Sequence, residues 1–140
     1  MSTPVDRIFV YGTLRVGMEA HSLIAERVVT SAPATIRGRL IALPPVSTEP
    51  LVVLPVGYPG LVEGHDSTVV GEVLTVARIA TVLPMLDDFE GDQYERVLRH
   101  VTLQNGAQMT AWCYVFTENP LQRRIIESGD WREYVRSRSQ

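Results

Sequence analysis

The chain has 140 residues, of which 16 are acidic and 13 basic, so its formal net charge is −3. All 13 basic residues are arginine, which excludes Schiff-base chemistry, a lysine general base and the P-loop motif. The single cysteine, Cys113, excludes an internal disulfide and a multi-cysteine zinc cluster. Three histidines, His21, His65 and His100, lie far apart and show no metal-ligand spacing, so we expect no metal site and give them surface or structural roles.

The charge pattern and the hydropathy pattern argue against two classes of partner. The arginines are scattered rather than gathered in a basic stripe, which argues against nucleic-acid binding. No apolar run approaches the ~20 residues needed to cross a membrane, and the first residues do not form a signal peptide. We expect a soluble cytoplasmic protein whose residues 1–140 fold as one domain.

The first half of the chain contains strand-like segments. Arg7–Tyr11 is a short apolar run that ends at Gly12, and Gly71 in a later run predicts a bulge or a close backbone approach. The proline-rich part from Pro44 to Pro59 is too apolar for a linker and predicts an ordered excursion. In chain order we predict a strand at Arg7–Tyr11, a short helix at Ala20–Val29, and strands at Thr35–Leu43 and Thr68–Val76.

A helix is predicted from about Arg78 to Phe89. Its apolar stripe has helical spacing, and Gly91 provides a natural stop. Pro84 falls inside the pattern, so we expect either a kink or a later start of the helix. The stripe consists of Ile79, Val82, Leu83 and Leu86.

A β-hairpin is predicted around Asn105-Gly106, a pair that favours a type I′ turn between Tyr94–Leu103 and Gln108–Thr117. With a two-residue loop, one face collects Val97, Arg99, Val101, Leu103, Thr110, Trp112, Tyr114 and Phe116. The other face collects Leu98, His100, Thr102, Met109, Ala111, Cys113 and Val115. Both faces are largely apolar, so we expect a central hairpin, with Cys113 as a packed core thiol.

The last part of the chain predicts a helical turn near Leu121–Glu127 and a tail from Asp130 to Arg136. Strands outnumber helices and do not alternate regularly with them. This favours an α+β domain with a curved or closed sheet.

Two local patterns could carry chemistry. The turn Tyr11–Arg15 follows a buried strand, and its glycine lets successive N–H groups point outward, where they could hold a carboxylate or an oxyanion. The alternative is an ordinary turn at the end of a strand.

The second pattern is an acidic cluster at the predicted C-terminus of the helix, formed by Asp87, Asp88 and Glu90. The helix dipole and mutual repulsion disfavour negative charge there, so a desolvated member would have a raised pKa and could act as a general base. The alternative is a solvated acidic helix end capped by Gly91.

Several motifs in this order resemble the γ-glutamylcyclotransferase-like family, and the resemblance covers nearly the whole chain. These motifs are Ile8–Arg15 (IFVYGTLR), Tyr58–Val62 (YPGLV), Val70–Val73 (VGEV), Leu86–Gly91 (LDDFEG), Tyr94–Arg96 (YER), Ala111–Phe116 (AWCYVF) and Ile126–Trp131 (IESGDW). The resemblance implies a small mixed β-barrel with flanking short helices. It also implies a reaction on γ-glutamyl amides in which the α-amine of the substrate attacks its own γ-carbonyl. The products are 5-oxoproline and a free amine, and no metal or organic cofactor is needed.

The resemblance also assigns roles to residues. The backbone of Tyr11, Gly12, Thr13 and Leu14 would bind the γ-glutamyl part of the substrate. Arg15 would add charge complementarity, and Tyr114 would lie over the pocket, or else be a core aromatic. Glu90 matches the catalytic glutamate, which takes a proton from the α-ammonium and gives one to the leaving amine.

Three functions are compatible with these residues. The first is a γ-glutamyl cyclotransferase, and the second is a non-catalytic binding protein for a γ-glutamyl or other carboxylated metabolite. The third is a biosynthetic enzyme that removes a protecting γ-glutamyl group. The segment from Leu43 to Tyr58 gives no signature of the leaving amine, and the chain fits either a monomer or a homodimer.

Overall fold

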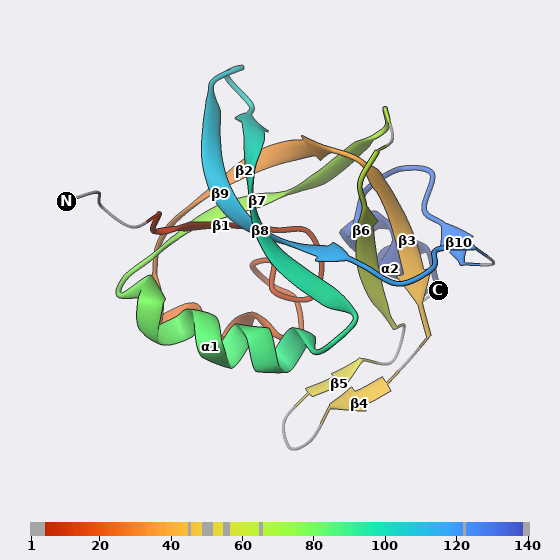
Figure 1. The fold of residues 1–140 in the computed structure, drawn as a ribbon, viewed down its shortest axis with the longest axis horizontal. Coiled ribbons are helices and arrows are strands. Elements are labelled where there is room, and N and C mark those ends of the chain that lie inside the picture. Colours follow the sequence, from red (N-terminus) through yellow and green to blue (C-terminus); the bar gives the residue numbers. More distant parts are fainter. Residues whose placement is uncertain are drawn as a thin grey trace.

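The computed structural model describes residues 5–44, 46–48, 52–54, 57–64, 66–121 and 123–138. Its centre is a closed five-stranded barrel in which β1 runs parallel to β9 and the other neighbours are antiparallel (Figure 1). In order around the barrel, the strands are β1 (Arg7–Val10), β7 (Thr68–Val76), β2 (Val28–Arg37), β8 (Tyr94–Leu103) and β9 (Gln108–Phe116). The prediction of a small mixed barrel with flanking helices is confirmed.

A three-stranded sheet lies beside the barrel, and a two-stranded ribbon extends from it (Figure 1). The predicted strand Thr35–Leu43 is divided at Gly38 between β2 and the start of this sheet. The predicted helical turn near residues 121–127 is wrong, because Arg124 and Ile125 pair with β3 instead. The sheet consists of β10 (Arg124–Ile125), β3 (Arg39–Leu43) and β6 (Tyr58–Val62), and the ribbon of β4 (Val46–Thr48) and β5 (Val52–Leu54).

The predicted helix at Ala20–Val29 is also wrong. The structure has two short 3₁₀ turns there, His21–Leu23 and Ala25–Arg27, and β2 begins at Val28. The run Val28-Val29-Thr30 is β-branched, and pairing with β7 overrides the weak helical pattern before it.

Two helices flank the barrel, α1 (Ile79–Glu90) and α2 (Trp131–Arg138). The apolar stripe of α1 is buried as predicted, and Gly91 ends the helix with a φ of 79° and an N–H that donates to the Asp87 carbonyl. Pro84 neither delays the start of α1 nor ends the helix, and it lies on the exposed side. α1 covers one end of β1, β7 and β9, where its stripe packs against residues of these strands.

The β8–β9 hairpin exists as predicted, but its register is shifted by one residue. Leu103 and Ala107 close a loop of three residues, in which Gly106 has a φ of 87°, so the two-residue type I′ loop is wrong. A slip of one residue changes which side chains share a face. Val101 therefore lies opposite Met109, and Arg96 lies opposite Tyr114.

The inside of the barrel is packed with side chains from all five strands. This cluster includes Phe9 on β1, Val73 on β7 and Cys113 on β9, and Trp131 of α2 joins it. The close approach predicted at Gly71 is confirmed: a Cβ atom there would collide with the carbonyl oxygen of Val10 and the ring of Phe9. β1 and β7 can pack this closely only because residue 71 has no side chain.

Candidate functional site

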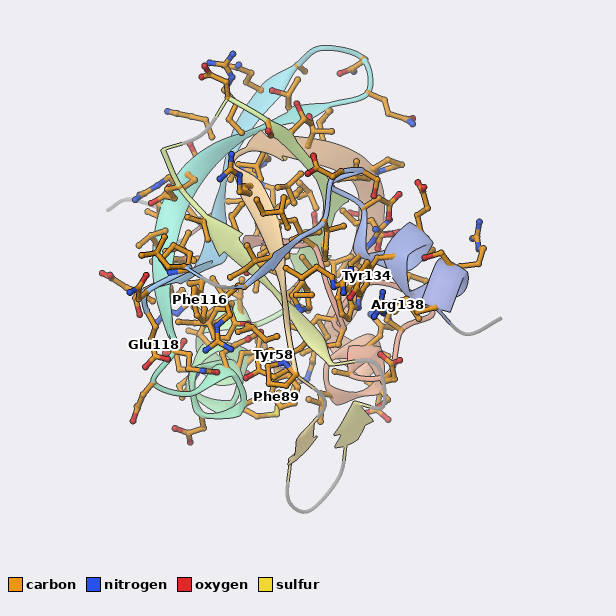
Figure 2. All side chains as sticks on the ribbon, turned by 90° about the vertical axis from the view of Figure 1, so that its right-hand side faces the viewer. Tyr58, Phe89, Phe116, Glu118, Tyr134 and Arg138 are labelled. Carbon is orange, nitrogen blue, oxygen red and sulfur yellow. The ribbon has the colours of Figure 1, made fainter. Side chains whose placement is uncertain are left out.

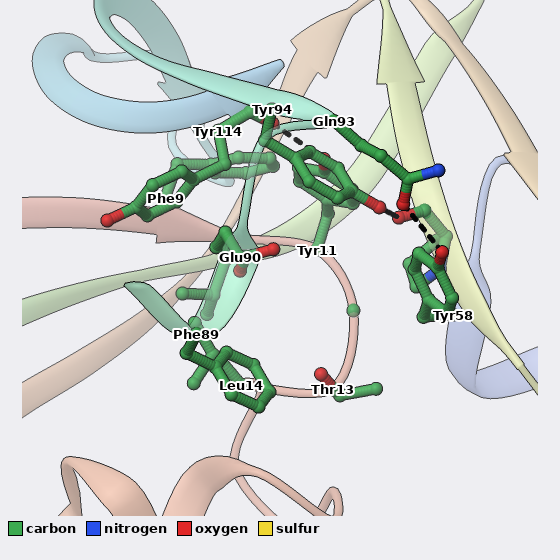
Figure 3. A pocket seen from close by; sticks show the side chains of 13 residues that line it. Phe9, Tyr11, Thr13, Leu14, Tyr58, Phe89, Glu90, Gln93, Tyr94 and Tyr114 are labelled. Atoms are coloured by element: carbon green, nitrogen blue, oxygen red, sulfur yellow. Dashed lines mark hydrogen bonds between the residues drawn. The ribbon is translucent and has the colours of Figure 1, made fainter. Parts of the chain in front are cut away.

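A cavity of about 260 Å³ lies where the ends of β1, α1 and β6 meet the β8–β9 hairpin. Its walls are mostly aromatic and backbone, and one carboxylate faces it (Figure 3). Its residues are Phe9, Val10, Tyr11, Gly12, Thr13, Leu14, Tyr58, Pro59, Phe89, Glu90, Gln93, Tyr94 and Tyr114. Side chains from distant parts of the chain meet here: Figure 2 shows Tyr58 and Phe89 at this end of the molecule, away from Tyr134 and Arg138 on α2.

The turn after β1 forms one wall of the cavity. Residues Tyr11–Leu14 are buried and all four line the cavity. Residue 12 must be glycine, because a Cβ atom there would lie 2.5 Å from Cγ of Pro59 on β6. Within the described residues, the amide N–H groups of Gly12, Thr13 and Leu14 donate no hydrogen bond, so they remain available as donors.

Glu90 is the last residue of α1, and its carboxylate lies among the aromatic rings of the cavity, with the loop that carries Thr13 on another side (Figure 3). In the part of the chain that the structure describes, this carboxylate has no hydrogen bond and no ion pair. Burial raises the pKa of Glu90 to about 8, because the surrounding protein disfavours the charged form. Its proton can therefore be exchanged near neutral pH.

Asp87, one turn earlier on α1, behaves in the opposite way. Two nitrogens of Arg96 donate to its carboxylate at 2.8 and 3.2 Å, and the Tyr114 hydroxyl donates to it at 2.7 Å. The hydrogen bonds from Arg96 lower the pKa of Asp87, so it stays charged. Mutual repulsion of these carboxylates was one predicted cause of a raised pKa, but Asp87 is neutralised by Arg96, and desolvation raises the pKa of Glu90.

Three tyrosine hydroxyls connect the walls of the cavity. Tyr11 donates to the Tyr114 carbonyl at 2.6 Å and accepts from the Leu61 amide at 3.1 Å. Tyr94 donates to the Pro59 carbonyl at 2.6 Å, and Tyr58 donates to the side-chain oxygen of Gln93 at 2.6 Å. Burial raises the pKa of the Tyr11 and Tyr94 hydroxyls, so both remain protonated donors.

The residues to which the family resemblance gave a role meet in this cavity, with one exception. Tyr11–Leu14, Glu90 and Tyr114 all line it. Arg15 does not: its side chain is buried behind the loop and pairs with Glu72 and Asp130 at 3.2 and 3.0 Å. The expected direct contact of Arg15 with a substrate is therefore not supported by its position.

Sequence reasoning missed several lining residues. Tyr58, Pro59 and Tyr94 belong to motifs that carried the family resemblance, which was the signal that could have identified them. Phe89 also belongs to one of these motifs, Leu86–Gly91, whereas Gln93 lies between two motifs and belongs to neither.

The remaining candidates have structural positions. Cys113 is a fully buried free thiol, and burial raises its pKa, so it is a core residue as predicted. His21 is half-buried with Nδ1 2.9 Å from the Leu14 carbonyl oxygen, and His100 is exposed, while His65 lies outside the described residues. The described residues contain no group of three or more His, Cys, Asp or Glu side chains that could hold a metal ion. They also include no helix with the length and apolar character needed to span a membrane.

The comparison with known families agrees with this geometry. Residues 8–133 match the family described as gamma-glutamyl cyclotransferase, AIG2-like. The chain belongs to this family. A protein of Vibrio cholerae that is provisionally named a gamma-glutamylcyclotransferase is 34% identical over 128 residues, which cover 91% of this chain and 96% of the relative. The gamma-glutamylaminecyclotransferase of Bos taurus is 35% identical over 115 residues, covering 79% of this chain and 64% of the relative.

Solved structures show the same gamma-glutamyl cyclotransferase fold. An AIG2-like protein from Mus musculus matches with a TM-score of 0.56 and 26% identity, covering 89% of this chain and 88% of that one. YkqA from Bacillus subtilis matches with a TM-score of 0.71 and 25% identity over 98% of this chain. The present chain spans only 44% of YkqA.

Proposed function

We propose that this member of the family is a γ-glutamyl cyclotransferase that converts a γ-glutamyl amide into 5-oxoproline and a free amine. One observation carries the proposal: the Glu90 carboxylate faces the cavity without a protein partner among the described residues, with its pKa raised to about 8. A group of this kind can accept and return a proton at neutral pH. A protein that only bound its ligand would not need it.

The reaction balances within one substrate molecule. The α-amine nitrogen attacks the γ-carbonyl carbon and forms the new C–N bond of the five-membered ring, and the original amide C–N bond then breaks. Glu90 accepts the proton that the α-ammonium must lose and returns a proton to the departing nitrogen. Because the nucleophile and the electrophile belong to the same molecule, the enzyme mainly has to fold the substrate into the attack geometry.

Recognition of negative charge would depend on the backbone. None of the described lining residues carries a positive charge. The free N–H groups of Gly12, Thr13 and Leu14 are therefore the donors that can hold the α-carboxylate of the substrate or the oxyanion that forms at the γ-carbonyl. The expected role of this loop in substrate binding is consistent with its position on the cavity wall.

The aromatic walls would enclose the carbon chain and exclude water from the reacting atoms. Tyr58, Phe89 and Tyr94 provide apolar surface on the cavity wall, against which the leaving amine would lie. The name of the bovine relative points to γ-glutamyl amines as substrates, so both amines and amino acids should be offered as leaving groups.

The test is to incubate the protein with a panel of γ-glutamyl amino acids and γ-glutamyl amines and to measure 5-oxoproline. We expect product from the wild type and almost none from Glu90→Gln. Asp88→Asn is the matched control, because it neutralises an exposed carboxylate two residues away and should keep activity. Absence of product with every substrate, or equal product from Glu90→Gln, would contradict the proposal, and tight binding of a γ-glutamyl compound without turnover would favour a binding protein.

A further inference from the structure

A group of four charged residues, two of them buried, lies directly behind the cavity loop. We call this group the loop clamp; it consists of Arg15 on the loop, Glu72 on β7, and Asp130 and Arg132 at the start of α2. Only 5% of Arg15 and 8% of Glu72 are exposed. None of the four lines the cavity, so the chemistry of the cavity does not explain why they are there.

Glu72 uses both carboxylate oxygens to hold the end of the loop. Oε1 accepts the backbone N–H of Val16 at 3.0 Å, and Oε2 accepts Nε of Arg15 at 3.2 Å and Nη2 of Arg132 at 3.3 Å. Arg132 also donates to the carbonyl oxygen of Val16. Both peptide groups of Val16 are therefore fixed to side chains from β7 and α2.

The clamp is completed at the start of α2. Asp130 accepts from Nη1 of Arg15 at 3.0 Å, and the same oxygen accepts the backbone N–H of Arg132 at 3.0 Å. Arg15 and Glu72 are the buried pair of this group, and removing either one leaves the charge of the other without compensation, which is costly. The position of the loop is thus fixed by contacts with β7 and α2 and not only by hydrogen bonds within the turn.

Every carbonyl from Gly12 to Val16 is engaged by a protein donor. Three of these carbonyl oxygens accept from backbone N–H groups: that of Gly12 from Arg15, that of Thr13 from Ala20 and that of Arg15 from Met18. The other two accept from side chains: that of Leu14 from Nδ1 of His21 and that of Val16 from Arg132. In the described structure, the amides of Gly12, Thr13 and Leu14 are left as donors with no protein acceptor. Because the carbonyl groups of the loop are hydrogen-bonded and these three amides are not, the peptide groups are held in an orientation that leaves the N–H groups available to an anion.

We propose that Arg15, Glu72 and Arg132 are positioning residues that hold the loop amides in the orientation that binds the γ-glutamyl part of the substrate. This inference rests on the proposed function. Arg15 then contributes to substrate binding through the loop rather than by contact. Because these residues do not touch the reacting atoms, their loss should weaken substrate binding more than it slows the proton transfers at Glu90.

The test compares Glu72→Gln with Glu63→Gln. The first change keeps an oxygen that can accept the Val16 N–H but removes the charge shared with Arg15 and Arg132. The second makes the same chemical change in an exposed ion pair with Arg99. For Glu72→Gln we expect KM to rise about tenfold while kcat stays within about threefold, and we expect no change in either constant for Glu63→Gln. A lower melting temperature with unchanged KM would overturn the inference and leave Glu72 a merely structural residue.

Arg132→Gln is the second variant, in case Glu72→Gln does not fold. The Arg132 side chain is 36% exposed, so its loss should be tolerated, and we expect a rise in KM of about threefold. Amide hydrogen exchange over residues 11–18 provides a readout that needs no activity. Faster exchange in Glu72→Gln than in Glu63→Gln supports the clamp even if the wild type makes no 5-oxoproline, and equal exchange in both contradicts it.

Discussion

Glu90 and Asp87 are three residues apart on the same helix, yet their surroundings shift the pKa values of the two carboxylates in opposite directions. Arg96 keeps Asp87 charged, whereas burial raises the pKa of Glu90 to about 8. Two carboxylates with separated pKa values are typical of sites that move protons. Here the charged carboxylate, Asp87, accepts a hydrogen bond from Tyr114, and the protonatable carboxylate, Glu90, faces the cavity.

The raised pKa of Glu90 predicts that stability depends on pH. The folded protein holds this proton up to about pH 8, whereas an ordinary glutamate loses it near 4.5. The folded state therefore binds more protons than the unfolded state between these values, and the free energy of unfolding falls as the pH rises from 4.5 to 8. Below pH 4.5 the contribution of Glu90 to the free energy of unfolding no longer changes with pH.

Urea unfolding of the wild type and of Glu90→Gln at pH 5 and pH 8 measures this effect. The glutamine side chain cannot ionise. The free energy of unfolding of the variant should therefore fall less between pH 5 and pH 8, and the variant should gain stability relative to the wild type at pH 8. An identical difference between the two proteins at both pH values would show that Glu90 has an ordinary pKa.

The same group predicts a pH dependence of activity. In the proposed mechanism Glu90 must be deprotonated to accept the proton of the substrate ammonium, so kcat/KM should rise with pH between 6 and about 8. Glu90→Gln should lose about 10²-fold to 10⁴-fold in kcat, the range for a general acid–base group. Initial rates of 5-oxoproline formation across this pH range are the measurement, and a flat wild-type profile would contradict the role of Glu90.

At this scale the sequence singled out Glu90 and Tyr11–Leu14 as candidates, because these residues lie in local motifs, and all of them line the cavity. It could not identify the partner of Arg15, since Glu72 is 57 residues away and nothing local marks the pair. An arginine after a glycine turn suggests a ligand contact, and only the packing of β7 and α2 behind the loop shows that the guanidinium points away from the cavity.

At the scale of elements, the β8–β9 hairpin and α1 together shape one side of the cavity. Arg96 on β8 lies over the ring of Trp112 on β9 with its Cζ 4.3 Å from the ring centroid, and the same guanidinium holds Asp87 on α1. The Tyr114 hydroxyl makes the second link to Asp87. The hairpin therefore keeps the C-terminal turn of α1, with Glu90, against the barrel.

Tyr114→Phe tests this link between elements. Loss of the hydroxyl should lower the free energy of unfolding by about 1 kcal/mol, the typical net contribution of one partly buried hydrogen bond. Tyr134→Phe is the control, because the Tyr134 hydroxyl makes no hydrogen bond within the described residues. Chemical denaturation of both variants is the measurement, and equal losses would show that the link to α1 contributes nothing.

Elements were predictable where the pattern was long and regular. The stripe of α1 and the run of β7 follow directly from periodicity, and Pro84 proved tolerable because it lies on the exposed side of α1. The hairpin register was not predictable from Asn105-Gly106, because that pair fits both a two-residue loop and the end of the three-residue loop seen here. Short elements such as β10 depend on a partner strand far along the chain and leave no local pattern.

At the scale of the whole molecule, closure of the barrel hides its interior from reagents. Cys113 on β9 is fully buried inside the barrel, and burial raises the pKa of its thiol, so little reactive thiolate is present. We expect no reaction with a thiol reagent such as DTNB in the native state and full reaction in denaturant. Rapid modification of the native protein would show that the barrel opens.

Helix α2 is attached to the barrel through Trp131. Trp131 is 1% exposed and packs in the barrel cluster, but its indole Nε1 has no hydrogen-bond partner among the described residues. Trp131→Ala should cost about 3–5 kcal/mol, because it leaves a large cavity. It should also raise KM, since Asp130 and Arg132 of the loop clamp lie on either side of this anchor.

Trp131→Phe separates packing from polarity. It keeps an aromatic ring and removes the unpaired N–H, so we expect a loss below about 1.5 kcal/mol and an unchanged KM. Urea unfolding and steady-state kinetics of both variants are the measurements. If Trp131→Phe cost as much as Trp131→Ala, the indole N–H would have a stabilising role that its surroundings do not reveal. If Trp131→Ala left KM unchanged, α2 would not be needed to hold the loop, because the clamp would keep its geometry without the anchor.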